Sequence, residues 1–160
     1  MPKISHRAEI LPLSPIRKLT PYAEKAVKEG KTIYHLNIGQ PDIKTPEIAV
    51  QAVKDFTPEV LEYTKSQGVD LLREKVVGYY AKHDISIDKD DLIITCGGSE
   101  ALIYVVATVA NADDEIIIPE PYYANYISFS EAFDAVCVPI TSSFDNNFAL
   151  PPIEEFEKKI

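Results

Sequence analysis

The sequence predicts an α/β fold built on a mostly parallel sheet, and three observations carry this prediction. Strand-like and helical segments alternate from residue 92 onward. The strand-like segments lack the polar face that a half-exposed antiparallel strand shows, which is typical of parallel strands covered on both sides. The chain has 160 residues, of which 46% are hydrophobic and 26% charged, so its length and composition suit one domain with a core.

The first part of the chain is expected to be helical, because prolines stand where helices begin. Four pairs place a candidate N-cap before a proline at the first helical position: Ser14-Pro15, Thr20-Pro21, Thr45-Pro46 and Thr57-Pro58. They predict a helical region over 15–29, broken near Thr20 and ended at Gly30 by a left-handed cap. A short strand over 33–37 and a helix over 46–56 follow.

The rest of the chain gives the alternation. Apolar residues at helical spacing predict a helix over 69–83, with acidic residues at its start and basic residues at its end. The remaining segments are, in order, strand 92–96, helix 99–110, strand 115–119, helix 122–133, strand 135–140 and the start of a helix over 152–160. The helix over 99–110 is apolar nearly all round, which predicts that it is buried. Because open α/β sheets usually have about five or six strands, we interpret the chain as a fragment.

Charge and cysteine content exclude several classes of function. The net charge of -9 argues against binding to nucleic acid or to an anionic membrane. Cys96 and Cys137 each lie in a predicted buried strand and form neither a metal spacing nor a disulfide framework, so a reducing cytoplasm is the expected location. No signal peptide is predicted, and the longest apolar run, over 101–110, is too short to span a bilayer.

The junction between strand 92–96 and the next helix carries the candidate chemistry. Gly97 and Gly98 allow a sharp turn and a close approach of the backbone to a ligand. From Ser99 onward, a helix N-terminus presents N–H groups to which a phosphate gains hydrogen bonds and dipole attraction. The segment has neither the P-loop nor the dinucleotide-binding glycine pattern. A tight strand–helix turn with Ser99 as N-cap fits the same residues, and this segment alone leaves both interpretations open.

Four motifs follow one another along nearly the whole chain. They are Gly-Gln-Pro-Asp-x-x-Thr-Pro from Gly39, Tyr-x4-Gly-x3-Leu-Arg from Tyr63, Gly-Gly-Ser-Glu-Ala from Gly97 and Asp-Glu-x-Ile-x-Pro-x-Pro-x-Tyr from Asp114. In this order they resemble the class I/II aminotransferases, fold-type I enzymes that use pyridoxal 5'-phosphate, and in particular the aspartate aminotransferase-like members.

The resemblance assigns cofactor roles to two of these motifs. Gly98, Ser99 and Glu100 correspond to the turn that holds the cofactor phosphate through backbone N–H groups and the serine hydroxyl. Tyr123 corresponds to the aromatic residue that stacks on the pyridine ring, a task that needs a π face. As an alternative, Tyr123 is a half-buried tyrosine that covers the edge of the sheet.

The resemblance also assigns roles to residues near the start of the chain. Tyr63 corresponds to the tyrosine that reaches across a dimer interface to the phosphate of the neighbouring subunit, with packing at a helix entry as the alternative. Gly39 corresponds to the position where the backbone meets the α-carboxylate of the substrate, with a glycine at a strand-end turn as the alternative. Asn111 stands where many relatives have a helix-ending glycine, and asparagine tolerates the left-handed conformation expected there.

The fold and activity of the family follow from the same resemblance. Residues 1–44 are expected to form an N-terminal arm and small-domain segment, and residues 45–160 the incomplete start of the three-layer αβα large domain. The implied protein is a homodimer, binds neither nucleic acid nor membrane, and transfers an amino group between an amino acid and a 2-oxo acid.

The resemblance further identifies what this sequence lacks. The lysine that forms the Schiff base in the family, the aspartate at the ring nitrogen, and the asparagine and arginine that complete the site have no counterpart here. We therefore expect no catalytic residue in this chain and no activity from it alone. A carbon–sulfur lyase or a cyclopropane-forming synthase shares these early motifs, and a non-catalytic dimerisation fragment is a third interpretation.

Overall fold

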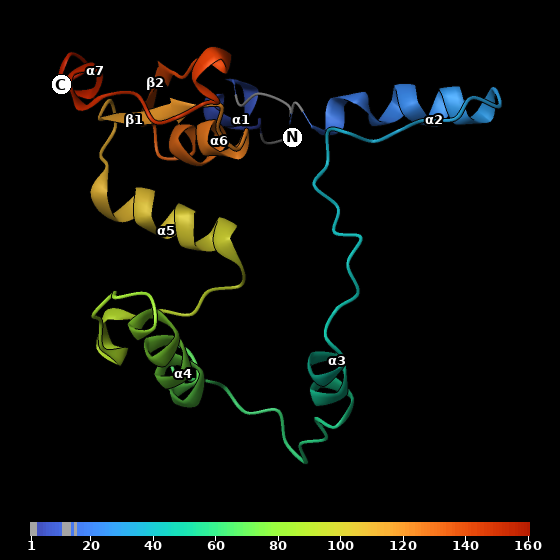
Figure 1. The fold of residues 1–160 in the computed structure, drawn as a ribbon, viewed down its shortest axis with the longest axis vertical. Helices are drawn as coiled ribbons and strands as arrows, with labels where there is room; N and C mark the ends of the chain where they lie inside the picture. The colour runs from blue at the N-terminus through green and yellow to red at the C-terminus, as the bar shows by residue number, and fades with distance from the viewer. Residues whose placement is uncertain (1–2, 11–13, 15) are drawn as a thin grey trace. The chain divides into compact units, whose positions relative to one another are not determined.

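The computed structural model describes residues 3–10, 14 and 16–160. The chain divides into two compact units (Figure 1), which are described separately. The first unit comprises Met1–Asn37 and Gly97–Ile160, and the second unit comprises Ile38–Cys96.

A pair of parallel strands lies at the centre of the first unit. Strand β1 (Glu115–Glu120) pairs with β2 (Val136–Thr141), in a register that runs from Glu115 beside Val136 to Glu120 beside Thr141. The chain crosses from β1 to β2 through helix α6 (Asn125–Glu131), as a parallel connection requires. The predicted parallel pairing is confirmed for these two strands.

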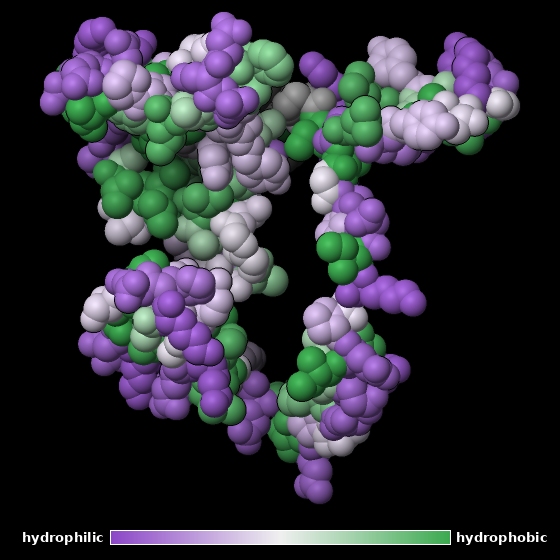
Figure 2. All heavy atoms as spheres, viewed as in Figure 1, coloured by the Kyte–Doolittle hydropathy of each residue, from purple (hydrophilic) through white to green (hydrophobic). Residues whose placement is uncertain are grey.

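Helix α5 (Gly98–Val109) precedes β1. Together with β1 and α6 it lines an apolar groove, whose residues include Leu102, Val106, Ile117 and Phe129. Apolar side chains over α5 and the elements beside it are visible in Figure 2.

The expected burial of α5 is wrong for most of the helix. Val106 is buried, but Tyr104, Val105 and Val109 are 51%, 55% and 69% exposed. The reason is that the described residues cover only the side of α5 that faces β1 and α6.

The predicted helix starts are confirmed only in part. Helix α2 (Thr20–Lys28) begins at Thr20 with Leu19 as its N-cap, and α3 (Glu47–Lys54) has Pro46 rather than Thr45 as its N-cap. No helix follows Thr57-Pro58.

A 3-10 turn η1 (Arg17–Leu19) leads into α2, which reproduces the predicted break near Thr20. Gly30 follows with φ +78° and donates to the carbonyl of Val27 at 2.9 Å. Pro15, the predicted start of this region, lies outside the described residues.

The short helix α1 (His6–Ile10) is linked to the turn before β2 by an ion pair. Arg7 Nε donates to Asp134 Oδ1 at 3.1 Å, and its Nη2 donates to Asp134 Oδ2. The Arg7 guanidinium lowers the pKa of the Asp134 carboxyl, mainly by hydrogen bonding.

Two predicted strands do not form. Residues 33–37 and 92–96 have no strand conformation, because no described segment forms a hydrogen-bonded ladder with them. In the segment 92–96, Ile94 N donates to the carbonyl of Gln67 at 2.9 Å. In consequence Cys96 is exposed rather than buried, whereas Cys137 is half-buried in β2.

The second unit contains α3 (Glu47–Lys54), α4 (Asp70–Ala81) and the 3-10 turn η2 (Lys89–Asp91). The first two confirm the helices predicted over 46–56 and 69–83. Turn η2 is held by a capping box in which Asp90 N donates to Asp88 Oδ1 at 2.7 Å and Asp88 N donates to Asp91 Oδ2 at 2.9 Å.

The end of the chain contains the 3-10 turn η3 (Phe144–Asn146) and helix α7 (Ile153–Glu157). Helix α7 confirms the helix start predicted over 152–160. Within the described ranges, no helix has the length and apolar content needed to cross a bilayer.

The left-handed residue after α5 is Asp113, with φ +69°, and not Asn111. Asn111 instead donates from its backbone N and its Nδ2 to Asp114 Oδ2, at 2.7 and 3.1 Å. These bonds to one carboxylate hold Asn111 outside the left-handed conformation and shift the reversal two residues along the chain.

We predict that Gly68→Ala lowers the free energy of unfolding by about 2–4 kcal/mol. Gly68 has φ +99°, and an added Cβ would lie 2.6 Å from Ile94 Cβ. The matched control is Gly78→Ala in α4, where an added Cβ meets nothing within 4 Å, so helix propensity should stabilise by about 0.5–1 kcal/mol. Denaturant unfolding measures both, and equal effects would contradict the prediction.

The ion pair of Arg7 and Asp134 predicts a pH-dependent contribution to stability. Because the pKa of Asp134 is lowered in the folded protein, the contribution is complete above the unfolded value of about 4 and is lost as pH falls through the folded pKa. Arg7→Gln should therefore destabilise the protein near neutral pH, and this difference should disappear in strong acid. Urea unfolding midpoints across the pH range, with Arg17→Gln as control, test this; a difference that persists in acid contradicts it.

Candidate functional site

The turn before α5 requires a glycine. Gly97 has φ +88° and ψ 169°, a backbone conformation that is essentially restricted to glycine. A Cβ added at Gly97 or Gly98 would meet no atom within 4 Å. The backbone of this turn therefore faces open space, where a ligand can approach it closely.

Gly98, Ser99 and Glu100 form the first turn of α5, and Gly97 is its N-cap. Ser99 thus lies inside the helix, so the alternative that made it the N-cap is wrong. Gly97 has no side chain with which to cap this helix end. An N-terminus of this kind offers backbone N–H groups and the positive end of the helix dipole to an anion.

The carboxylate of Glu100 is directed along the helix. Tyr104 Oη donates to Glu100 Oε1 at 3.1 Å, and this bond, with the charge of Glu100, raises the pKa of the Tyr104 phenol. Any contribution of Glu100 to anion binding would therefore come from its backbone.

Tyr123 follows β1, after the cis peptide between Glu120 and Pro121. Its side chain is 46% exposed. Asn125 Nδ2 donates to the Tyr123 hydroxyl at 2.8 Å, and the Tyr126 ring lies at 88° to the Tyr123 ring with centroids 5.9 Å apart. An exposed aromatic ring is thus held by neighbours on its own helix and turn.

The turn at Gly98 and the Tyr123 segment lie on the same side of the first unit. Helix α5 runs antiparallel to β1, so the N-terminus of α5 and the C-terminal end of β1 point the same way (Figure 1). In open α/β sheets, ligands bind at the carboxyl ends of the strands. The structure therefore places these two predicted site segments at the edge where such a site is expected.

Tyr63 and Gly39 belong to the second unit. Tyr63 is fully exposed, at 105%, so the alternative of packing at a helix entry is wrong for this structure. Gly39 is exposed, and an added Cβ there meets nothing within 4 Å. Since residues 33–37 form no strand, Gly39 is not at a strand-end turn either. The roles assigned to Tyr63 and Gly39 stay predictions.

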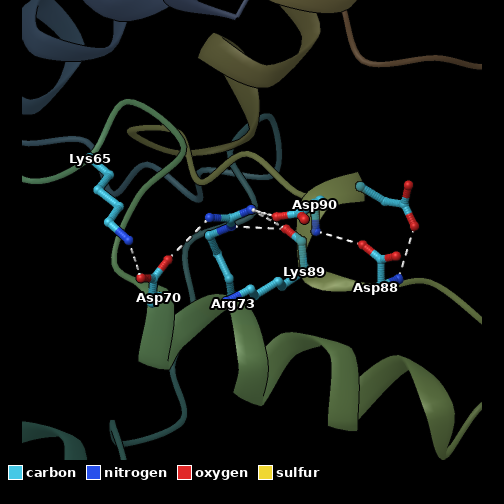
Figure 3. A network of polar contacts seen from close by, with 7 residues as sticks. Lys65, Asp70, Arg73, Asp88, Lys89 and Asp90 are labelled. Atoms are coloured by element: carbon cyan, nitrogen blue, oxygen red, sulfur yellow. Dashed lines mark hydrogen bonds and ion pairs between the residues drawn. The ribbon is translucent and has the colours of Figure 1, made fainter.

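Sequence reasoning assigned no role to Arg73, the last residue of the second motif. Its side chain is 5% exposed. Arg73 Nε donates to the carbonyl of Lys89 at 2.9 Å, Nη1 to Asp70 Oδ1 at 3.2 Å and Nη2 to Asp90 Oδ1 at 3.1 Å, as Figure 3 shows. The signal in the sequence is an acidic residue three positions before the arginine on the same helix, a spacing that allows an ion pair.

Lys65 completes this network by an ion pair with Asp70. The hydrogen bond from Lys65 is the main cause that lowers the pKa of Asp70. We call Lys65, Asp70, Arg73, Lys89 and Asp90 the Arg73 cluster. Among the residues that the structure describes, no group of histidine, cysteine or acidic side chains is placed to hold a metal ion.

Comparison with known proteins decides the family. Residues 31–154 match the family described as Aminotransferase class I and II. This chain belongs to that family. The family uses pyridoxal 5'-phosphate, and the first turn of α5 fits its phosphate in donor chemistry and in open space.

Curated relatives of this aminotransferase chain come from several organisms. It is 34% identical over 157 residues to the aspartate aminotransferase of Pyrococcus horikoshii, covering 97% of this chain and 39% of the relative. It is 37% identical over 109 residues to the (5-formylfuran-3-yl)methyl phosphate transaminase of Methanocaldococcus jannaschii, covering 67% of this chain and 30% of the relative. The chain therefore spans well under half the length of these relatives.

Solved structures show the same fold. The aspartate aminotransferase of Thermotoga maritima aligns with a TM-score of 0.87 at 26% identity, over 98% of this chain and 42% of that one. The aspartate aminotransferase of Rhizobium meliloti aligns with a TM-score of 0.91 at 25% identity, over 100% of this chain and 40% of that one. The aminotransferase chain thus has the architecture of part of a fold-type I enzyme.

Proposed function

We propose that the complete protein is a pyridoxal-phosphate-dependent transaminase that moves an amino group between an amino acid and a 2-oxo acid. In this proposal the present chain supplies the turn that binds the cofactor phosphate. The observation that carries it is the N-terminus of α5, where Gly97 at φ +88° leads into an exposed first turn. The helix dipole contributes about 0.3–2 kcal/mol to binding an anion at such a place.

In this proposal, the residues of the α5 turn and the Tyr123 segment each have a task in binding the cofactor. The backbone of Gly98, Ser99 and Glu100 and the hydroxyl of Ser99 donate to the phosphate. The Tyr123 ring fixes the plane of the cofactor ring, and the amide of Asn125 orients Tyr123 through its hydroxyl. When bound, the cofactor supplies an electron-withdrawing ring that makes the proton on the substrate Cα labile.

The second unit supplies the remaining contacts in this proposal. Tyr63 reaches the cofactor phosphate of a second subunit, so the complete protein is a homodimer. Its full exposure supports a partner outside its own unit. The backbone at Gly39, which is open to approach, receives the α-carboxylate of the substrate.

We place the chain within the complete protein as follows. Residues 1–44 form the N-terminal arm and a small-domain segment, and residues 45–160 begin the three-layer αβα large domain. The scarcity of buried apolar residues, limited among the described residues to Val106, Ala135 and Ile140, supports a sheet with further strands. The complete enzyme works in the cytoplasm, in keeping with the exposed thiol of Cys96.

Amino-group transfer is favoured over the reaction of a carbon–sulfur lyase or a cyclopropane-forming synthase. Both curated relatives described above are named as transaminases. Their names specify different substrates, aspartate in one and a furan methyl phosphate in the other, so the assay of this protein has to span several amino donors.

Two substitutions in the full-length protein test the cofactor contacts. Ser99→Ala should weaken the binding of pyridoxal phosphate about three- to tenfold through loss of one hydrogen bond. Tyr123→Ala should weaken it about two- to tenfold through loss of stacking. Tyr123→Phe keeps the ring but loses the bond from Asn125, so it should weaken binding less than Tyr123→Ala. Equilibrium dialysis measures the affinities. The control is Thr108→Ala, at the far end of α5. If Thr108→Ala weakened binding as much as Ser99→Ala, the role assigned to Ser99 would be contradicted.

A comparison of the full-length protein with residues 1–160 tests the function itself. With pyridoxal phosphate, an amino acid and a 2-oxo acid, we expect the full-length protein to form the new amino acid and the 160-residue chain to form none. Borohydride reduction should fix the cofactor to a lysine only in the full-length protein. Lyase products without amino transfer, or a trapped lysine within residues 1–160, would refute the proposal in its present form.

A further inference from the structure

The Arg73 cluster occupies an unusual place in the second unit. Arg73 is the one buried residue among the described residues 38–96. An unpaired guanidinium at such a site would be costly, and here it is satisfied by the Lys89 carbonyl and by two carboxylates. The planar fork of arginine reaches these partners together, which the single ammonium of a lysine does not do.

The cluster joins two parts of the chain that are distant in sequence. Asp70 is the first residue of α4, and Lys89 and Asp90 belong to η2. Arg73 binds both, so it fixes the start of α4 against η2. Figure 3 shows its guanidinium between Asp70 on one side and Lys89 with Asp90 on the other.

The loop before α4 is tied to the same region at further points. Lys65 forms an ion pair with Asp70. Ile94 N donates to the carbonyl of Gln67 at 2.9 Å. Gly68 lies so close to Ile94 that an added Cβ would be 2.6 Å from the Cβ of that residue. Residues 65–70 are therefore held between the start of α4 and the segment that follows η2.

Tyr63 lies two residues before this held segment. Its side chain is fully exposed, so packing within the second unit does not fix its position. The backbone that follows it, through Lys65, is the part of the chain anchored by the cluster. Movement of residues 65–70 would displace Tyr63, and displacements of about 1 Å are enough to weaken a positioned contact greatly.

We propose that Arg73 is a positioning residue for Tyr63, because it anchors the 65–70 segment through Asp70 and Lys65 and so places the tyrosine hydroxyl for the cofactor phosphate. This rests on the role given to Tyr63 in the proposed function. Arg73 itself touches neither cofactor nor substrate. Replacing Arg73 should therefore weaken the binding of ligands that carry the phosphate, because Tyr63 contacts that group.

The test compares Arg73→Lys with the unmodified full-length protein, using pyridoxal phosphate and pyridoxal as ligands. Arg73→Lys should weaken pyridoxal phosphate binding about tenfold, the effect of losing a charge-assisted hydrogen bond that positions a contact. Binding of pyridoxal, which lacks the phosphate, should change little. Hydrogen–deuterium exchange of residues 65–70 and of the Ile94 amide should become faster.

A double-mutant cycle with Tyr63→Phe identifies the route of the effect. If Arg73 acts through Tyr63, Arg73→Lys should add little once Tyr63 lacks its hydroxyl. The exposed Arg17 gives the matched control, Arg17→Lys, which should alter neither affinity nor exchange. Asp90→Asn removes the negative charge from a partner of Arg73 whose side chain is 83% exposed. It should give a smaller change in the same direction, so the test survives if Arg73→Lys does not fold.

The outcomes separate this proposal from the proposed function. The positioning role would be overturned if Arg73→Lys weakened the binding of pyridoxal phosphate and of pyridoxal equally. It would also be overturned if the effects of Arg73→Lys and Tyr63→Phe on affinity were additive. Either result would show a general structural role for Arg73. The positioning role would also be overturned if Tyr63→Phe bound pyridoxal phosphate with normal affinity. Failure of the transaminase proposal appears instead as absence of amino transfer in the unmodified protein.

Discussion

The parallel pairing of β1 and β2 is the constraint on which the first unit depends. Six residues of each strand run in register, and two parallel strands cannot be joined by a tight turn. The chain must therefore leave the end of β1, return through α6 and enter β2 in the same direction. Helix α5 leads into β1 and runs antiparallel to it, so α5 starts at the edge where β1 ends (Figure 1). The turn at Gly97 and the Tyr123 segment therefore occupy one edge, because α5 and β1 run in opposite directions.

The second unit depends on polar contacts rather than on an apolar core. Arg73 is buried among main-chain and carboxylate oxygens, while apolar residues of α3 such as Ile48 and Val53 are 81% and 77% exposed. Gly68 adds a close contact with Ile94 that no larger residue permits. These two residues explain in physical terms why a Tyr-x4-Gly-x3-Leu-Arg motif needs its glycine and its arginine. The glycine allows the approach of two segments, and the arginine joins them.

Most of the predicted helices formed because helix signals are local, although no helix follows Thr57-Pro58. Thr20, Pro46 and Gly30 mark helix ends through their own backbone preferences, and the structure places helix boundaries close to them. Strands were predicted correctly only where the chain provides a partner. Residues 115–119 and 135–140 pair with each other, whereas 33–37 and 92–96 have no neighbouring strand in the described part of the chain. An apolar run specifies a strand only when another strand satisfies its hydrogen bonds.

Some features of the candidate site were likewise predictable from the sequence, and others were not. The sequence by itself determined that Gly97 and Gly98 stand before a helix, that Tyr123 follows an apolar strand, and that ordered motifs resemble one family, because glycine geometry, apolar patterning and motif spacing are properties of neighbouring residues. Only the tertiary structure decided that Ser99 lies inside the helix and that Arg73 is buried. The reason is that burial is set by contacts between segments separated in the sequence, such as the carbonyl of Lys89 with the guanidinium of Arg73. Several residues in the Gly97 segment are compatible with the N-cap, and only the conformation that Gly97 adopts shows which one it is.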